Sequence, residues 1–395
     1  MGSLDGIKVL DLSRILAGPY ATQILADHGA EVWKVEMPGK GDDTRAFGPP
    51  FTNGESAYFL SVNRNKRSIT VDMKKPEGLE IVRSLADKAD VLIENFRPGA
   101  LDRLGLDYES ASRRNPRLVY CSISGFGQTG PWALKPGYDL AIQGMGGLMS
   151  LTGVTDGPPT KVGTSIADII SGIYAAQGIL LALYAREKTG KGQRVDISML
   201  DGQVSLLTYQ AGIYFATGES PKRLGNQHPT ICPYETFQTA DGYINLAVGN
   251  DKLWKEFCNL VARPDLAADD RFDTNPRRVH HHDALFPILS EIFRHDTTRE
   301  WIKKLDQAGI PAGPIFDVGD VLELEQTKSR EMVVQVDHKK AGNIRLTGIP
   351  IKLSDTPPAI KSPPPLLGEH TDEILSEILG YGPEKIEALR TANAI

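Results

Sequence analysis

The amino-acid sequence predicts an α/β protein, in which a large unit with a doubly wound parallel sheet is joined to a smaller α+β unit. From Ile7 to Phe126, apolar strand-like runs alternate with helical patterns, which is typical of a parallel α/β unit. The polar, turn-rich segment 218–227 is typical of a linker. The length of 395 residues exceeds that of one typical domain, so a second core is expected.

The first 126 residues contain five candidate strands separated by helices. The strands are IKVLDL, EVWKVE, SITVDM, VLIENF and LVYCSISGF. Two intervening segments, GPYATQILADHGA and PEGLEIVRSLADKAD, predict helices, and the second has Pro76 in its first turn. In such a sheet, ligands bind outside the carboxyl ends of the strands, which directs attention to the loops that follow these strands.

These loops carry basic residues close to the aromatic Phe96. The basic residues are Arg14, Lys40, Lys74, Lys75, Arg97 and Arg103. Basic side chains and helix amino ends would hold phosphates, while apolar and backbone groups would hold an aromatic base. The pattern therefore favours a ligand with phosphates and a base, although solvated loop charges remain the alternative for any single residue.

The glycine-rich motif GFGQTGP, residues 125–131, follows the fifth strand with the spacing of a dinucleotide-binding loop. A proline and a tryptophan interrupt the helix that such a loop requires, so we predict a loop that borders an active site instead. The glycines and methionines of segment 135–153 indicate close packing beside a ligand. Tyr138 and Asp139 are the reactive candidates in this segment.

The segment 161–186 predicts a long buried helix with one carboxylate, Asp168, near its start. About 18 residues without another acid or base follow this aspartate. Free N–H groups and the helix dipole in the first turn favour an ionised carboxylate, so we expect a normal or lowered pKa. Such a group suits a nucleophile, and the alternative is an aspartate that only caps the helix.

The remaining sequence predicts a second compact unit of about 100 residues. A hairpin should turn at Asp241–Gly242, and three amphipathic helices should follow it. GIPAGPI and VVQVDHKKAGNIRLTGIPIKLS return to a strand pattern, and a helix should begin near Thr371.

Composition limits the partners. The formal net charge of −6 argues against binding nucleic acid or an acidic membrane through bulk charge. Three scattered cysteines predict neither disulfides nor a zinc site, and the run His280–His282 is expected to be solvated rather than to bind metal. The amino terminus shows no targeting signal, and the long helix suits a soluble core, so we expect a cytoplasmic protein with no metal centre and no membrane partner.

Taken together, several blocks of the sequence resemble the class III CoA-transferase family over nearly the whole chain. These blocks include LDLSRILAGPYATQILADHGAEVWKVE, NRNKRSITVDMKKPEG, ENFRPGALDRLGLDY, SISGFGQTGP, PGYD, KTGKGQ, GIPAGPI and PPPLLGEHTDEIL. The resemblance implies an interlocked homodimer, with a large Rossmann-like CoA-binding domain formed by residues 1–217 and 330–395 and a small domain formed by residues 218–329. It also implies that a coenzyme A thioester is a substrate and that no cofactor is bound permanently.

The resemblance assigns roles to individual residues. Asp168 matches the catalytic aspartate, and Tyr138 is a candidate stabiliser of developing oxyanions. The CoA-binding positions that match are Ala17, Val71, Asp72, Met73, Lys74, Asn95, Phe96 and Arg103, and Leu16 stands at a further CoA-binding position. Leu16, Met37 and Pro136 replace polar or basic residues found elsewhere in the family, so Arg14, Arg97 or Lys135 should supply those contacts.

The resemblance implies transfer through an aspartyl anhydride and an aspartyl-CoA thioester at Asp168. The related α-methylacyl-CoA racemases carry histidine where this chain has Tyr138, and a phenol is a poor base at neutral pH, so transfer is favoured over racemisation. A non-catalytic CoA-ester binding protein is the third alternative.

The segments GDDTRAFGPPF and SVNRNKRSI are similar in sequence to the succinyl-CoA:glutarate (hydroxymethylglutarate) type of this family. A dicarboxylate acceptor such as glutarate or itaconate is therefore expected, with Arg14 or Arg45 as partner of its distal carboxylate.

Overall fold

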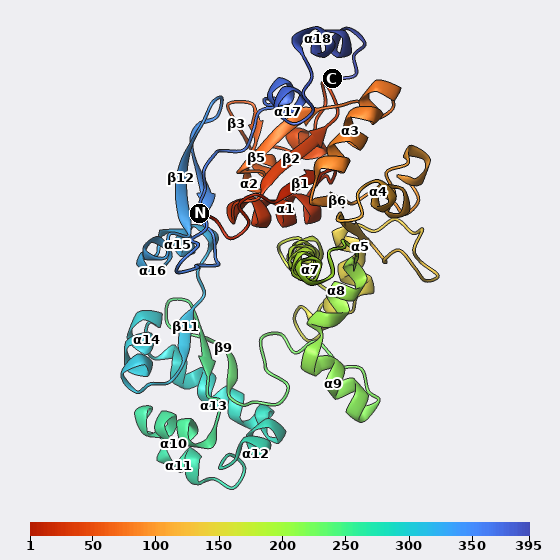
Figure 1. The fold of residues 1–395 in the computed structure, drawn as a ribbon. Coiled ribbons are helices and arrows are strands. Elements are labelled where there is room, and N and C mark those ends of the chain that lie inside the picture. Colours follow the sequence, from red (N-terminus) through yellow and green to blue (C-terminus); the bar gives the residue numbers. More distant parts are fainter. The chain divides into compact units, whose positions relative to one another are not determined.

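The structure, a computed structural model, describes residues 1–395 and contains two compact units (Figure 1). Unit 1 comprises Met1–Leu148, Lys161–Phe215 and Glu325–Ile395. Unit 2 comprises Met149–Thr160 and Ala216–Leu324. The chain thus crosses between the units four times, and the short segment Met149–Thr160 groups with the second unit.

Unit 1 is built on a six-stranded sheet with the order β5-β2-β1-β6-β7-β8, in which every pair is parallel. The strands are β1 (Lys8–Asp11), β2 (Glu31–Glu36), β5 (Lys66–Thr70), β6 (Val91–Glu94), β7 (Val119–Ser124) and β8 (Arg194–Ser198). The first five overlap the strands predicted from the sequence, although β5 begins before the predicted run SITVDM and ends at Thr70, and the α/β class is confirmed. The sixth ends at Ser198, because the Ser198 hydroxyl accepts the N–H of Asp201 and starts a helix at Met199.

Helices cover both faces of this sheet, with α1 (Ala17–Asp27) and α7 (Ile166–Thr189) on one of them. The other helices of unit 1 are α2 (Ala57–Ser61), α3 (Pro76–Lys88), α4 (Tyr108–Arg114), α5 (Asp139–Met145), α8 (Met199–Leu206), α9 (Thr208–Thr217), α16 (Glu325–Ser329), α17 (Thr371–Glu377) and α18 (Pro383–Thr391). The short helix α6 (Leu148–Leu151) lies where the chain enters unit 2. Two 3₁₀ turns, η1 (Asp43–Ala46) and η2 (Asp102–Leu104), and two hairpins, β3 (Phe51–Thr52) with β4 (Glu55–Ser56) and β12 (Val333–His338) with β13 (Gly342–Thr347), complete unit 1.

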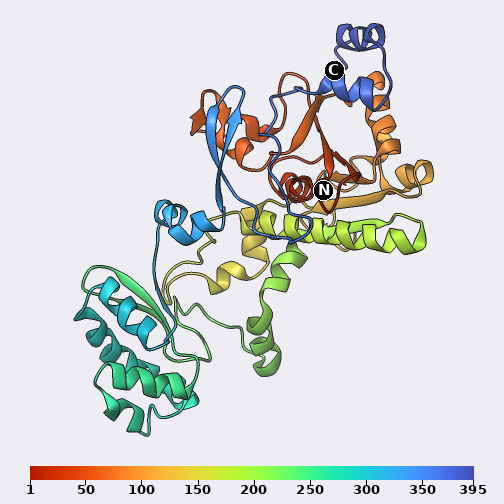
Figure 2. The same cartoon turned by 60° about the vertical axis from the view of Figure 1, so that its left-hand side comes forward.

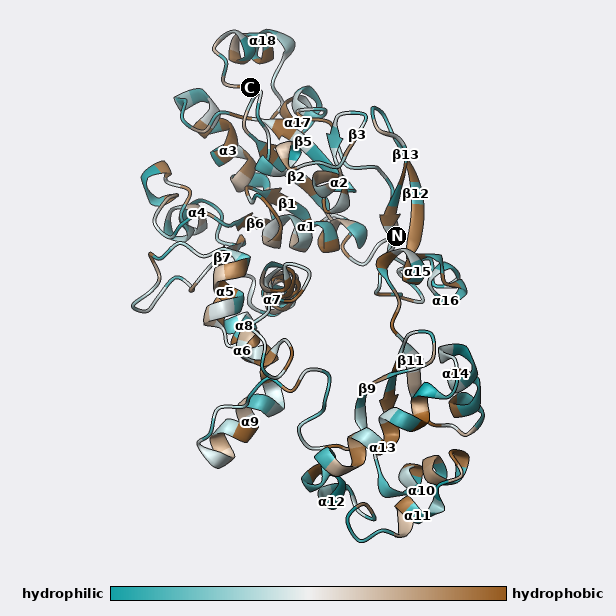
Figure 3. Ribbon diagram, turned by 180° about the vertical axis from the view of Figure 1, so that it is seen from behind, coloured by the Kyte–Doolittle hydropathy of each residue, from teal (hydrophilic) through white to brown (hydrophobic).

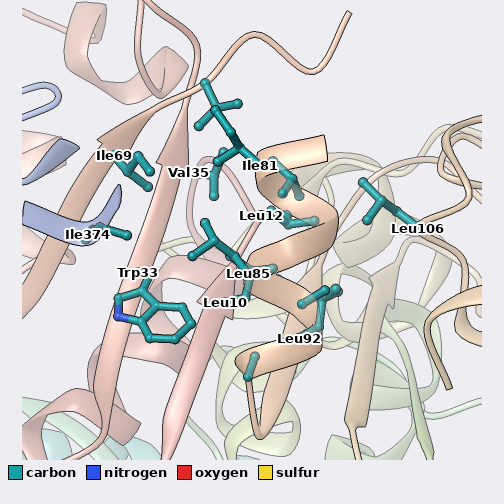
Figure 4. Packing of buried hydrophobic residues seen from close by; sticks show 14 of the residues in the cluster. Leu10, Leu12, Trp33, Val35, Ile69, Ile81, Leu85, Leu92, Leu106 and Ile374 are labelled. Carbon is teal, nitrogen blue, oxygen red and sulfur yellow. The ribbon is translucent and has the colours of Figure 1, made fainter. Parts of the chain in front are cut away.

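The two faces hold separate cores because successive strand residues point to opposite sides. Leu10 packs with Trp33, Leu85 and Ile374 on one face, as Figure 4 shows. Val9 belongs to the core of the other face, which α1 and α7 cover. Each fully buried leucine contributes about 1.5–3 kcal/mol.

The helix α7, seen lengthwise in Figure 2, packs against α1 and carries many of the hydrophobic residues seen in Figure 3. It ends at Gly190, whose left-handed φ of 73° closes the last turn. The helices approach closely, because a Cβ atom at Gly172 would lie 2.7 Å from the carbonyl oxygen of Ala17. Although α7 is long and apolar enough to cross a membrane, it also packs against α5, α8, β7 and β8, as a core helix does.

Unit 2 contains a three-stranded antiparallel sheet with the order β11-β10-β9. Its elements are β9 (Tyr234–Gln238), β10 (Tyr243–Ala247), α10 (Asp251–Leu260), α11 (Pro264–Ala268), α12 (Asn275–His280), α13 (His282–Arg294), α14 (Thr298–Gln307), β11 (Ala312–Pro314) and α15 (Val318–Glu323). The predicted hairpin is confirmed, since Tyr243 pairs with Gln238 across the turn. Stacked aromatic rings fill the core, with the ring centroids of Phe237 and Phe293 4.7 Å apart.

Candidate active site

An open cavity of about 380 Å³ lies in unit 1 where β1, β6 and β7 end. The predicted site residues that line it are Arg14, Ala17, Asn95, Phe96, Arg97, Lys135, Tyr138 and Asp168. They come from four separate stretches of sequence. The rule that parallel strands gather their following loops at one edge explains most of this assembly. No group of His, Cys, Asp and Glu side chains suited to a metal ion is found in either unit.

Asp168 lies in the first turn of α7, and its carboxylate borders this cavity. Burial of the side chain and, as a smaller contribution, the nearby carboxylate of Asp139 together raise the pKa of Asp168 to about 7. The expectation of a normal or lowered pKa was therefore wrong. The amino end of the helix favours the ionised form, but desolvation and the like charge outweigh it.

Asp139, at the start of α5, is attached to the segment that carries Asp168. One of its carboxylate oxygens accepts the N–H of Ala167 at 2.9 Å. The other accepts the side-chain amide of Gln143 at 2.8 Å. The amide oxygen of Gln143, which is fully buried, accepts the N–H of Val162 at 2.9 Å. Side chains of α5 thus bond both to the segment that precedes α7, at Val162, and to the first turn of α7, at Ala167.

The loop after β1 is held in a strained shape beside the cavity. Ile15 has a φ of 70°, a left-handed conformation that β-branched residues rarely adopt. The side chain of Asn95 donates to the carbonyl of Arg14 at 2.7 Å and accepts its N–H at 2.9 Å. A carboxylate oxygen of Asp42 accepts the N–H of Ile15 at 3.2 Å. These bonds fix the loop conformation from two sides.

A second cavity, of about 280 Å³, adjoins the first and shares Arg14, Phe96 and Ala100 with it. The predicted residues Val71, Asp72, Met73 and Lys74 line this second cavity, together with Met37, Leu101 and Leu104. The guanidinium of Arg14 lies 5.3 Å from the centre of the Phe96 ring, at the boundary between the two cavities. An elongated ligand with an apolar, aromatic end and anionic groups fits this arrangement.

Cationic side chains stand along the first cavity. Arg14 is half exposed and forms a 3.3 Å ion pair with Asp43. The ammonium group of Lys135 lies 4.3 Å from the centre of the Trp132 ring. Exposed cations with such weak partners remain available to an anionic ligand.

Three residues named from the sequence lie elsewhere. Leu16 is buried at the start of α1 and lines neither cavity, and Arg103 lies in η2 outside both. Arg45 forms two 2.7 Å hydrogen bonds to Glu36, and its side chain is 11% exposed. The suggestion that Arg45 binds a substrate carboxylate is therefore wrong, because its charge is already paired in the interior.

The structure adds residues that the sequence had not suggested. Tyr58, on α2, lies near Asp168 and Asp139; burial and then these two negative charges raise its pKa to about 12. Asp43 lines the cavity and follows the second strand, so the strand-end rule could have identified it. No sequence signal places Tyr58, because the helix that carries it follows a short hairpin outside the alternating pattern.

Gly125 and Gly137 cross backbone to backbone at the base of the loop that leads to Tyr138. A Cβ atom on Gly137 would lie 2.5 Å from the Cα atom of Gly125, and one on Gly125 would lie 2.7 Å from the Cα atom of Gly137. Both glycines line the first cavity. The predicted active-site loop is thus closed by a contact that only glycine permits.

Comparison with known proteins gives a consistent picture. The sequence model of CoA-transferase family III matches residues 4–371. The chain is 43% identical to succinyl-CoA:glutarate CoA-transferase of Mus musculus, with 100% of this chain and 91% of that protein covered. It is 40% identical to succinyl-CoA:mesaconate CoA-transferase of Haloarcula hispanica, with 98% and 100% covered. A solved structure of a CAIB/BAIF family protein from Brucella suis aligns with a TM-score of 0.85 at 46% identity, covering 95% of this chain and 99% of that one.

Proposed function

The chain belongs to CoA-transferase family III, and from this premise we propose that it moves coenzyme A from succinyl-CoA to a dicarboxylate acceptor through covalent intermediates on Asp168. The observation that carries the proposal is the cavity that brings the Asp168 carboxylate together with cationic loops at the carboxyl edge of the sheet. Relatives that act on glutarate and mesaconate support the choice of a C5 dicarboxylate, and itaconate belongs to the same class.

The ligand is proposed to span both cavities. The base and ribose of CoA would lie in the second cavity, against Met37 and the segment 71–74. The pantetheine chain would pass Phe96, and the thioester would reach Asp168. Arg14 at the shared boundary, with Arg97 and Lys135, would then meet the phosphates or the free carboxylate of the acyl group.

Each chemical step balances without a cofactor. A carboxylate oxygen of Asp168 attacks the thioester carbonyl carbon, the carbon–sulfur bond breaks, and the negative charge leaves on the thiolate of CoA. The thiolate attacks the aspartyl carbonyl of the anhydride and releases succinate. The acceptor carboxylate next attacks the carbonyl of the aspartyl-CoA thioester, which expels the thiolate and forms a second anhydride. The thiolate then attacks the acceptor carbonyl of this anhydride and releases the Asp168 carboxylate. Tyr138, exposed at the rim of the cavity, is proposed to donate a hydrogen bond to the oxyanions.

A pKa near 7 suits this chemistry. At neutral pH a substantial fraction of Asp168 is ionised, and a more basic carboxylate is a stronger nucleophile. The absence of an imidazole at position 138 favours transfer over racemisation.

A second copy of this chain is part of the proposal. The apolar side chains of Ile173, Leu181 and Tyr184 on α7, and of Val204 and Phe215 on α8 and α9, are exposed in the single chain. A homodimer would cover these side chains, and light scattering on the purified protein tests whether it forms.

The three free, buried cysteines suit a reducing compartment such as the proposed cytoplasm.

Trapping of the intermediate tests the function. The protein is incubated with succinyl-CoA, treated with borohydride or hydroxylamine, digested and examined by mass spectrometry. We expect modification at Asp168, none in Asp168→Asn, and full modification in Asp43→Asn, which removes the other carboxylate of the same cavity. An unmodified Asp168 with exchange of α-protons in deuterated water would show a racemase instead. Binding of succinyl-CoA without modification of Asp168 and without proton exchange would show a non-catalytic protein.

A panel of C4, C5 and branched dicarboxylates, with glutarate and itaconate among them, identifies the acceptor.

A further inference from the structure

The carboxylate of Asp139 acts as an external cap for α7. Ser165 occupies the N-cap position of this helix, but its side chain makes no capping hydrogen bond. The N–H of Ala167, one of the free donors of the first turn, is instead satisfied by Asp139 from α5. Ala167 directly precedes Asp168, so the bond anchors the residue next to the nucleophile.

The second oxygen of Asp139 is also fixed. It accepts the amide of Gln143, which cannot turn away freely because its own oxygen accepts the N–H of Val162. Hydrogen bonds to both of its oxygens therefore hold the Asp139 carboxylate in place beside the first turn of α7.

Other charged and titratable groups also surround Asp168. Tyr58 approaches from α2, and the groups that share its cavity are Arg14, Asp43, Arg97, Lys135 and Tyr138. Among these neighbours, Asp139 is the one whose charge acts appreciably on the ionisation of Asp168, second only to burial.

We propose that Asp139 is a positioning residue of the transfer reaction: it holds the first turn of α7, and its charge destabilises the free carboxylate of Asp168 relative to the acylated forms. This inference rests on the proposed function. When Asp168 attacks the thioester, its negative charge passes to the departing thiolate, and both the anhydride and the aspartyl-CoA thioester are neutral at this position. The repulsion between the two aspartates is thus present before acylation and absent after it.

Substitution of Asp139 tests the proposal through the pH profile of kcat/KM for succinyl-CoA. Asp139→Asn removes the charge and keeps an oxygen that can accept the N–H of Ala167. We expect the acidic limb of the profile to move down by about half to one pH unit, and the covalently modified fraction of Asp168 in the presence of donor alone to fall several-fold. Asp139→Glu, which restores the charge, should return the limb to its original pH.

A purely structural role predicts a different result. It would lower the melting temperature and the maximal rate of Asp139→Asn without moving the limb, and that outcome would overturn the proposal. Should the asparagine variant fail to fold, Asp139→Ser supplies a neutral residue that is also a good cap. The pH profile of its kcat/KM is then interpreted in the same way. If Asp168 of the unaltered protein is not modified by succinyl-CoA, the proposed function itself fails; if it is modified but the limb stays in place, only the role of Asp139 fails.

Discussion

Lys34 in β2 and Lys66 in the edge strand β5 are fully buried, and each is held by specific partners. The ammonium group of Lys34 bonds to Asp42 at 2.8 Å and to the carbonyl of Ser13 at 3.1 Å. Burial alone would lower the pKa of Lys34, but the charges of Asp42 and Asp11 raise it above its ordinary value. Such ionic groups cost much to desolvate, and here they hold the loop after β1 that forms one wall of the site.

The same residues show where prediction from sequence stops. Polar residues that alternate with apolar ones in a strand usually face solvent, so a lysine within EVWKVE gave no sign of complete burial. Asp168, Tyr138 and the loop residues could be named because each follows a strand or starts a helix. Their charge states could not be named, because these depend on neighbours such as Asp139 that only the folded chain brings close.

The raised pKa of Asp168 has a consequence for stability. The folded state holds this proton up to about pH 7, whereas an unfolded aspartate loses it near pH 3.8, so stability falls as the pH rises through that window. Asp168→Asn removes this dependence. We expect the variant to be more stable than the unaltered protein by on the order of 2 to 4 kcal/mol at pH 8 and equal to it near pH 3.

Urea denaturation at several pH values measures the difference. Gln177→Ala, on the exposed side of the same helix, should show no such trend with pH. A constant difference between Asp168→Asn and the unaltered protein at every pH would contradict the expectation.

At the scale of elements, the loop between β7 and α5 depends on the crossing of Gly125 and Gly137. Gly137→Ala places a Cβ atom 2.5 Å from a backbone atom that no side-chain rotation can relieve. We expect a loss of about 1–3 kcal/mol in stability and at least a tenfold loss in kcat/KM, since Tyr138 and Asp139 follow directly. Thermal unfolding and steady-state rates measure both effects.

Gly249→Ala is the matched control, because a Cβ atom at Gly249 meets no other atom within 4 Å. Its stability and activity should stay close to those of the unaltered protein. If Gly137→Ala behaves in the same way as this control, the loop does not depend on the close crossing.

Elements whose apolar residues recur with a clear helix or strand period were predicted well. Short elements that depend on contacts with distant parts of the chain were not. The five strands and the helices α1, α3 and α7 have apolar spacing that reveals them. The strands β3 and β4 have two residues each and the turn η1 has four, too few for any period to show. Yet η1 supplies Asp43 to the cavity, and only its place after β2 points to this residue.

At the scale of the molecule, the last residues of the chain complete the first core. Ile386, Leu389 and Ala394 are buried in the cluster formed by α3 and the central strands. The carbonyl of Ala394 also accepts the N–H of Asp72 at 2.9 Å, and that of Ala392 accepts the ammonium group of Lys75. The C-terminal segment therefore supports the wall of the second cavity.

Deletion of residues 383–395 should affect both stability and binding. We expect a loss of at least about 4 kcal/mol, because two large buried side chains are removed, and a several-fold rise in KM for the acyl-CoA ester. Denaturant unfolding and initial rates check these effects. Arg390→Ala, on the exposed side of α18, should change neither by much, whereas an unchanged KM in the deleted protein would argue against support of the cavity wall.

This completion of the core also sets an order for biosynthesis. The strands of unit 1 leave the ribosome first, and all of residues 216–324 are made before α17 and α18 follow. Until then the apolar surface of Trp33 and Leu85 lacks Ile374, Leu375 and Leu389, its partners from the C-terminal helices. The small unit can fold during translation, but the large one must wait with an incomplete hydrophobic face, which is the period when a chaperone or a second nascent chain would meet it.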